Sequence, residues 1–300
     1  MLTDPRKKAM AELKTCPFLV INLDRSPERL DAIRAQLEPQ GLVVERVPAV
    51  DARLISEDER RALGCYRFSP DGGMPLSVVD AAICLSHFKA LTRFLESDAP
   101  FAVVLEDDAR ITPLALSVVA EVLRDPHRLP DFDGLELSGW GRSEMPILPV
   151  MQCGPVTIGK ARKSTPGAAM TLYSRQGAAK ILRKAHPLRS HWDNYLSLSW
   201  LHGARLYTAR PFPASQDSGF ASTNVEVTNA PQIRKRPLDQ WLRRARYRIH
   251  QGPRKFLSDL IWMGLPAMMN WPGSTVSVAT DLHPDHASVE ASGEAVPTSR

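Results

Sequence analysis

The sequence has few cysteines, no apolar run of membrane-spanning length and no secretory signal at its start. The four cysteines are widely scattered, with no Cys-x-x-Cys pair and no histidine at the spacing of zinc ligands. We therefore expect reduced thiols in a reducing compartment rather than disulfides or a zinc site. Residues 1–14 are polar and charged and lack the apolar segment of a signal peptide. These absences disfavour a secreted, disulfide-stabilised protein and an integral membrane protein.

Charge is distributed unevenly along the chain. The net charge is +5, yet residues 234–255 alone hold nine basic residues and one acid, Asp239, a local charge of +8. The remainder is therefore about −3 (+5 less +8), which argues against a nucleic-acid-binding protein. The apolar and charged fractions, 43% and 24%, are those of an ordinary globular protein.

The most informative segment is an apolar run that ends in three carboxylates. Residues 101–105 have the length and composition of a strand buried on both faces, as in a sheet covered by helices. Glu106, Asp107 and Asp108 follow at its carboxyl end, where open α/β sheets bind their ligands. Because side chains alternate along an extended chain, Glu106 and Asp108 are expected to point the same way and Asp107 elsewhere.

Glu106 and Asp108 are therefore candidate metal ligands. Two hard oxygen donors backed by a dry strand suit Mg²⁺ or Mn²⁺ held jointly by the protein and a diphosphate. The alternative is a solvated turn, because clusters of charged residues usually lie in water.

The start of the chain predicts a strand, a helix and a second strand. Residues 17–23 and 42–47 are short apolar runs, and apolar residues recur at helical spacing through residues 27–37 between them. This order is typical of a parallel sheet with right-handed crossovers. The sequence therefore predicts an α/β fold.

Further along, residues 76–96 carry a clear apolar helical face, residues 167–173 read as a strand, and Ser174 caps a helix that runs to Lys184. The polar residues 51–73 predict a mobile surface loop, because they end in a strong turn signal. Residues 146–164 predict an irregular flap, because they are rich in proline, glycine and basic residues.

Five polar residues outside the carboxylate cluster are candidates for the site. Asn22, Asp24 and Arg25 are the polar groups at the end of the first strand, where Asp24 and Arg25 can meet a nucleotide; a solvated loop pair is the alternative for Asp24 and Arg25. His87 lies on the border of the apolar face of its helix, where a packed structural histidine is the alternative. Asp193 lies close to a helix start, where a helix cap is the alternative.

The basic segment predicts an amphipathic helix. Five apolar residues fall within roughly 100° of helical arc, and most of the arginines lie outside it; the apolar residues are Leu238, Trp241, Leu242, Ala245 and Ile249. Such a helix suits an anionic bilayer surface, with the contact extending over residues 234–271. The alternative is a helix that packs on the core and leaves its basic face in water.

Several blocks of the chain, in order, resemble glycosyltransferase family 25, the bacterial lipopolysaccharide glycosyltransferases related to collagen galactosyltransferases. The resemblance covers about residues 17–224, and the blocks are 18–29, 47–51, 85–87, 104–108, 167–174 and Asp193.

The resemblance implies a GT-A-like nucleotide-binding domain with a mostly parallel sheet flanked by helices. It also implies a UDP-sugar donor, a divalent metal, Mn²⁺ or Mg²⁺, and inverting transfer of a hexose, usually galactose, to a lipopolysaccharide or other surface-glycan acceptor. In that setting Glu106 and Asp108 would hold the metal, and Asp193 would be the catalytic base. His87 would orient the diphosphate, and Asn22, Asp24 and Arg25 would meet the uridine or pyrophosphate.

We expect four regions: an N-terminal extension (1–16), a glycosyltransferase domain (17–225), a basic helical tail (226–272) and a disordered end (273–300). The expected location is the cytoplasm, peripheral on the inner face of the cell membrane. Two other functions are kept open. A metal-dependent phosphohydrolase would use the same acidic strand end but usually needs two metals and more ligands, and a non-catalytic membrane-associated protein would keep the fold without turnover.

Overall fold

A computed structural model of the protein describes residues 5–65, 76–139, 146–162, 166–186, 188, 190–217, 237–269 and 271. The strands are β1 (Phe18–Asn22), β2 (Val44–Pro48), β3 (Phe101–Glu106), β4 (Ala109–Ile111), β5 (Gly134–Glu136), β6 (Leu148–Cys153), β7 (Val156–Lys160), β8 (Met170–Ser174), β9 (Leu206–Arg210) and β10 (Ala214–Gln216).

The α-helices are α1 (Pro5–Lys14), α2 (Pro27–Leu37), α3 (Glu57–Leu63), α4 (Val78–Glu96), α5 (Pro113–Arg124), α6 (Arg175–Leu182), α7 (Trp192–Leu196), α8 (Ser199–His202), α9 (Pro237–Met263) and α10 (Leu265–Met269). Short 3-10 turns lie at Glu38–Gln40, Ala52–Leu54 and Pro126–Arg128.

The described strands form an eight-stranded sheet in the order β2-β1-β3-β8-β5-β9-β7-β6, and β4 pairs with β10 in a second, small sheet. β1 runs parallel to both β2 and β3, and β5 runs parallel to β9. β8 is antiparallel to β3 and β5, and β7 is antiparallel to β9 and β6. The predicted α/β fold with a helix-flanked central sheet is therefore confirmed, and it is consistent with a GT-A-like domain; among the described strands of this sheet three pairings are parallel and four are antiparallel.

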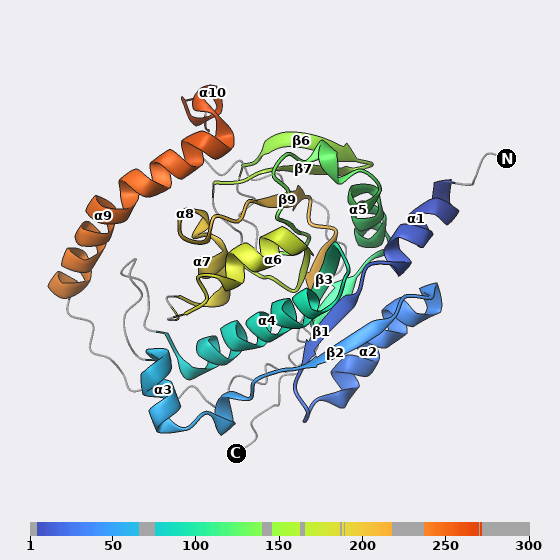
Figure 1. Ribbon diagram of the computed structural model, residues 1–300, viewed down its shortest axis with the longest axis horizontal. Helices are drawn as coiled ribbons and strands as arrows, with labels where there is room; N and C mark the ends of the chain where they lie inside the picture. The colour runs from blue at the N-terminus through green and yellow to red at the C-terminus, as the bar shows by residue number, and fades with distance from the viewer. Residues whose placement is uncertain are drawn as a thin grey trace, which may run out of the picture.

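Alternation along the central strands divides the core into two layers. In β1, Phe18 and Val20 face the layer that contains α2 and α5, whereas Leu19 and Ile21 face the layer of α4, α6 and α7. Every residue of β1 and β8 is buried. Figure 1 shows α4, α6 and α7 together in front of the sheet. The central strands are apolar throughout because helices cover both of their faces.

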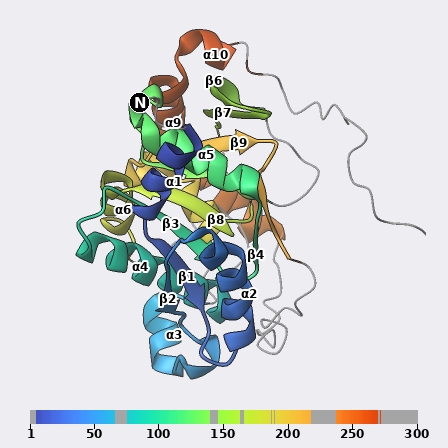
Figure 2. The ribbon, with the colours of Figure 1, turned by 90° about the vertical axis from the view of Figure 1, so that its right-hand side faces the viewer.

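The N-terminal extension is helical. α1 packs against α5, as Figure 2 shows, and Leu13 at its end is buried in the same core layer. The four cysteines, Cys16, Cys65, Cys84 and Cys153, are buried with free thiols, as the sequence predicted. Burial raises the pKa of the Cys16 thiol to about 12, so it stays protonated and unreactive at neutral pH.

Two predicted loops are partly wrong. Residues 146–164 contain a regular hairpin, because Val156 and Ile158 alternate into the core and Gly154, at φ 55°, makes the turn between β6 and β7. Residues 51–73 contain α3, whose first turn is closed by a capping box between Ser56 and Glu59. The remainder of that predicted loop, from residue 66, lies outside the described residues.

The C-terminal helical extension is present as α9 and α10. No helix among the described residues has both the length and the apolar character that crossing a membrane requires. The predicted region boundaries at residues 225 and 272 fall outside the described residues, as does the expected disordered end.

Gly177 is a point of close approach between α6 and the segment before β5. A Cβ atom at this position would lie 2.0 Å from the backbone oxygen of Asp133. We therefore expect Gly177→Ala to lower the free energy of unfolding by about 3 kcal/mol, because neither backbone segment can move aside cheaply. Denaturant unfolding measures this change.

Gly252→Ala is the matched control, because a Cβ at Gly252 in α9 would meet nothing within 4 Å. The gain in helix propensity is offset by contact of the new Cβ with the ring of Pro253, so the free energy of unfolding should change by no more than about 1 kcal/mol. Equal stability of the two variants would show that the contact at Gly177 is not tight.

Candidate functional site

Glu106 and Asp108 lie together at the carboxyl end of β3. The amide nitrogen of Gln216, at the end of β10, lies 2.8 Å from Glu106 Oε2 and 3.4 Å from Asp108 Oδ1. The two carboxylate side chains are about one quarter exposed, at 25% and 24%. The structure thus brings the two predicted metal ligands to one point, beside a third polar group from a distant strand.

Electrostatics at this pair favour a bound cation. Burial, followed by repulsion from Glu106, raises the pKa of Asp108 to about 6, although the charge of Arg29 opposes the shift. Two carboxylates so close together are costly to ionise in a partly buried place, and a divalent cation would relieve that cost. No group of three or more His, Cys, Asp or Glu side chains suited to a metal occurs within the described ranges, so any third protein donor here is a different kind of group.

Asp107 points away from this pair, as alternation predicts. Its Oδ1 accepts a hydrogen bond from Arg29 Nη1 at 2.6 Å, and its Oδ2 accepts one from Asn22 Nδ2 at 2.8 Å. Burial raises the pKa of Asp107 despite the nearby Arg29 charge. Asp107 therefore ties the carboxyl end of β3 to β1 and to α2.

Asn22 is held inside this network. It is 1% exposed, and its amide also donates to the Ser26 backbone oxygen at 2.8 Å and accepts from Arg46 Nε at 3.0 Å. With both amide atoms engaged, Asn22 fixes the loop after β1. Its predicted contact with a nucleotide stays a prediction, since a ligand would have to replace one of these bonds.

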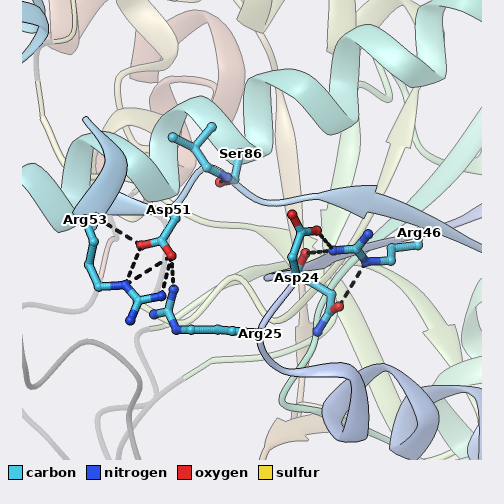
Figure 3. A network of polar contacts seen from close by, with 8 residues as sticks. Asp24, Arg25, Arg46, Asp51, Arg53 and Ser86 are labelled. Carbon is cyan, nitrogen blue, oxygen red and sulfur yellow. Dashed lines mark hydrogen bonds and ion pairs between the residues drawn. The ribbon is translucent and has the colours of Figure 1, made fainter. Parts of the chain in front are cut away.

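Asp24 and Arg25 each form an ion pair, Asp24 with a residue in β2 and Arg25 with a residue just after it. Asp24 pairs with Arg46, and Arg25 pairs with Asp51, which Arg53 also contacts; Figure 3 shows Asp51 between Arg25 and Arg53. Hydrogen bonding from Arg53 is the main reason that the pKa of Asp51 falls to about 2. Three guanidinium groups thus lie near the carboxyl ends of β1 and β2.

His87 connects α4 to the carboxylate pair Glu106 and Asp108. Its Nε2 lies 3.2 Å from Glu106 Oε1, and its ring stacks on Trp192 with centroids 4.4 Å apart and planes 11° apart. The residue is 2% exposed, and its Nδ1 has no hydrogen-bond partner in the part of the chain that the structure describes. The stacked ring fixes the direction of the Glu106 carboxylate.

Asp193 follows Trp192 in α7 and lies on the same side of the sheet. Its Oδ2 accepts a hydrogen bond from the backbone nitrogen of Gly167 at 3.0 Å. Gly167 has φ 103°, which an L side chain rarely adopts, so a glycine at this position lets the backbone reach Asp193. Burial, and then repulsion from Glu106, raises the pKa of Asp193. A carboxylate with a raised pKa is better suited to accept a proton.

His202 contacts backbone oxygens of α7, and its burial leads to a prediction about how stability depends on pH. It is fully buried; its Nε2 lies 3.2 Å from the Tyr195 oxygen and 3.3 Å from the Leu196 oxygen, and its Nδ1 accepts from Ala204 N. Burial lowers the pKa of His202 from 6.5 to about 4. The folded protein therefore keeps this ring neutral where the unfolded chain protonates it. Stability should fall as pH drops from 6.5 towards 4, by about 3 kcal/mol in total.

His202→Gln is the variant that isolates this effect, because the Gln amide can still donate to the α7 carbonyl groups but does not titrate. Denaturant unfolding at a series of pH values should give a flatter stability profile for the variant in that window. Parallel profiles for the two proteins would contradict a buried neutral His202.

The segment that supplies Asn22, His87, Glu106 and Asp108 also has recognisable relatives. A family model described as "Glycosyltransferase family 25 (LPS biosynthesis protein)" matches residues 15–145. The N-terminal part of the chain, residues 15–145, is thus similar to glycosyltransferase family 25. The resemblance seen in the sequence is thereby confirmed.

Curated relatives carry the same family description. A glycosyltransferase 25 family member from Aedes aegypti is 34% identical over 119 residues, which is 38% of this chain and 19% of that protein. A member from Anopheles gambiae is 29% identical over 206 residues, or 63% of this chain and 34% of that protein. The chain therefore spans about a fifth to a third of the length of these relatives.

Two residues of this candidate site had not been singled out from the sequence. Arg29 was seen only as part of a helix start, yet it contacts Asp107 and lies 3.8 Å from Asp108. Gln216 is separated from Asp108 by 108 residues, and nothing in its local sequence points to the carboxylates. A polar residue at the end of a short strand was the available signal, and it is a weak one.

Proposed function

We propose that this chain is an inverting, metal-dependent glycosyltransferase that moves a hexose, with galactose the first candidate, from a UDP-sugar to a lipopolysaccharide or other surface-glycan acceptor. The observation that carries the proposal is the convergence of Glu106, Asp108 and Gln216 at the carboxyl end of β3. Similarity to this family supports the sugar-transfer class of reaction.

The residues fit a divalent cation. Glu106 and Asp108 offer hard carboxylate oxygens, and the buried Gln216 Oε1 has no hydrogen-bond partner within the described part of the chain. The two ends of an amide are assigned from its hydrogen bonds, and a half-turn of the Gln216 amide would direct this oxygen at a cation between the carboxylates. Bound Mn²⁺ or Mg²⁺ would supply Lewis-acid neutralisation of the charge that grows on the β-phosphate of departing UDP.

The chain's own residues would perform the remaining tasks. Asp193 would accept the proton of the acceptor hydroxyl as the new bond forms on the face opposite the leaving group. His87 would hold Glu106 in place and, through it, the diphosphate. Arg25 and Asp24, with Asn22 behind them, would meet the uridine or pyrophosphate beside the guanidinium groups of Arg46 and Arg53.

Gln216 gives a direct test of the metal site. Gln216→Leu should weaken Mn²⁺ binding about tenfold, because the cation loses a ligand. It should also lower the stability of the metal-free protein, because the carboxylates lose a hydrogen-bond donor. Gln216→Glu should also lower the metal-free stability, through repulsion, but should retain or strengthen Mn²⁺ binding. Calorimetric titration with Mn²⁺ alone, and thermal unfolding, measure both effects.

The matched control is Gln152→Leu, since Gln152 is exposed on β6 and bonds locally to the Gly154 oxygen. It should leave both measurements unchanged. Unchanged Mn²⁺ binding in both Gln216 variants would remove Gln216 from the site.

A donor screen tests the function as a whole. Thermal unfolding with UDP-galactose, UDP-glucose and their N-acetyl forms should give a rise in Tm only when Mn²⁺ or Mg²⁺ is also present, because a ligand of the native state stabilises it. Product analysis should then show acceptor-dependent release of UDP. Release of free sugar at the same rate without acceptor would instead indicate a hydrolase, and no binding at all would indicate a non-catalytic protein.

We also propose a cytoplasmic location on the inner face of the cell membrane. Four buried, unpaired thiols support a reducing compartment. Fractionation followed by thiol labelling of the unfolded protein tests this, since oxidised cysteines would contradict it.

A further inference from the structure

α9 uses opposite faces for two different purposes. Its C-terminal part is bound to the core: Lys160 Nζ donates to the Trp262 oxygen at 2.8 Å, and Arg205 Nη1 donates to Ser258 Oγ at 2.9 Å. Asp259, 3% exposed, pairs with Lys255 at 2.7 Å and with Arg162 at 3.4 Å. This polar contact surface fixes how the helix is rotated about its own axis.

The opposite face of α9 is apolar and open to solvent. Leu242, Ile249 and Phe256 are 50%, 71% and 54% exposed and recur every seven residues. At about 100° per residue they lie roughly 120–160° around the helix from the buried Trp262. The exposure of this row does not mean that the helix is incompletely packed, because α9 already contacts the core through its other side.

Other exposed apolar residues lie on α9 up to about 140° around the helix from this row, and on α10. They are Trp241 (64%), Leu257 (56%), Ile261 (71%), Leu265 (56%) and Met269 (77%). Within α9, from Trp241 to Ile261, these residues extend over roughly 30 Å at the rise of an α-helix, and Leu265 and Met269 continue them on α10. Figure 1 shows α9 and α10 along the outer edge of the molecule. An exposed apolar surface of this length marks a contact with another phase or molecule.

The charge beside the row identifies the contact. Arg246, Arg248 and Arg254 are exposed on α9, and the sequence from Gln240 to Ser258 contains no acidic residue. Exposed apolar side chains with guanidinium groups among and around them, and a tryptophan near one end, are complementary to an anionic lipid surface. A protein groove would more often be met by a compact cluster of apolar side chains.

We propose that α9 and α10 bind an anionic lipid bilayer, with their exposed apolar side chains between Trp241 and Met269 inserted among the acyl chains and the arginines at the lipid phosphates. Their polar contacts with Lys160 and Arg205 keep the catalytic domain attached. This binding is a property of the helix surface and does not depend on the proposed sugar transfer.

Vesicle co-sedimentation of the full chain tests this inference. The protein should sediment with phosphatidylglycerol-containing vesicles and much less with pure phosphatidylcholine, and raised salt should weaken its binding. The triple variant Leu242→Gln, Ile249→Gln, Phe256→Gln should bind anionic vesicles at least tenfold more weakly, because it loses the inserted side chains. Its Tm should stay unchanged, because these side chains are exposed in the free protein.

The matched control is Val43→Gln with Leu54→Gln, since these side chains are 80% and 82% exposed and lie far from α9 in sequence. This variant should bind vesicles like the parent. Equal vesicle binding by the triple variant and the parent, or absence of binding by the parent, would overturn the inference. A third result would also overturn it: the parent is a dimer by light scattering and does not bind vesicles, and the triple variant is a monomer. The row would then join two copies of the chain.

Discussion

Replacing Asp108 with asparagine is expected to lower UDP-sugar turnover by about 10³-fold and to abolish Mn²⁺-dependent binding of UDP. The change removes one of two anionic oxygen donors at the point where negative charge grows on the leaving group, and electrostatic stabilisation of that charge is commonly the largest contribution to catalysis. UDP release from UDP-galactose with a lipopolysaccharide acceptor, and calorimetric titration with UDP and Mn²⁺, measure the two effects.

The same substitution should not harm folding. Burial and Glu106 raise the pKa of Asp108, so its ionised form is already costly in the metal-free protein. An uncharged amide of the same shape relieves that repulsion, and the metal-free Tm should hold or rise. A carboxylate whose removal stabilises the fold but eliminates binding is characteristic of a functional site, where stability is given up for function.

Asp107→Asn is the informative comparison, because the two residues are adjacent and chemically identical. Asp107 is paired with Arg29 in a buried setting, and removing its charge weakens that pairing, which Asp108, at 3.8 Å from Arg29, replaces only in part. The expected result is a loss of stability of about 3 kcal/mol or more, with Mn²⁺-dependent UDP binding retained in the folded fraction. If Asp107→Asn abolished binding while Asp108→Asn did not, the assignment of the two carboxylates would be reversed.

Asp193→Asn is expected to reduce acceptor-dependent transfer by about 10²- to 10⁴-fold while leaving donor binding intact. The asparagine oxygen can still accept from the Gly167 nitrogen, so the local structure should persist. The amide cannot take the acceptor proton, and general-base catalysis contributes rate factors of this size. Transfer assays with UDP-galactose, together with UDP binding in Mn²⁺, separate the loss of a base from the loss of a binding group.

Two results would contradict this role for Asp193. A loss of Mn²⁺-dependent UDP binding would mean that Asp193 belongs to the metal or donor site. A variant that transfers sugar normally but unfolds at lower temperature would mean that Asp193 is a structural residue that holds Gly167 and the first turn of α7.

The direction of the three carboxylates was predictable from the sequence because it depends on local geometry alone. Alternation along a strand predicts that Asp107 turns away from Glu106 and Asp108, and in the structure Gln216 contacts Glu106 and Asp108 whereas Asp107 contacts Asn22 and Arg29. The partners of these groups were not predictable. Gln216 and Arg29 reach the carboxylates from other elements, and sequence separation gives no measure of such contacts.

The prediction of an irregular flap at residues 146–164 was wrong for a related reason. The segment with β6 and β7 looked irregular by composition, because proline, glycine and basic residues dominate it. Its fold is decided by a few apolar side chains, such as Val156 and Ile158, which gain a partner only when β9 lies beside them. Strand preference depends on packing against neighbours more than on the strand itself.

The amphipathic pattern of α9 also left its orientation undecided. Helical periodicity alone allowed either docking on the core or contact with a membrane. The structure combines the two, because Ser258, Asp259 and Trp262 occupy the docked side and the apolar row faces outward.

By itself the sequence determined the α/β class, the strand end that carries the carboxylates Glu106 and Asp108, and the helical nature of the tail, because each follows from periodicity within one segment. Only the tertiary structure decided that Asn22 and Asp107 brace the site, that His87 and Gln216 contact Glu106, and that α9 turns its apolar row to solvent. These facts depend on how separate segments pack, and packing free energy is a property of the assembled chain.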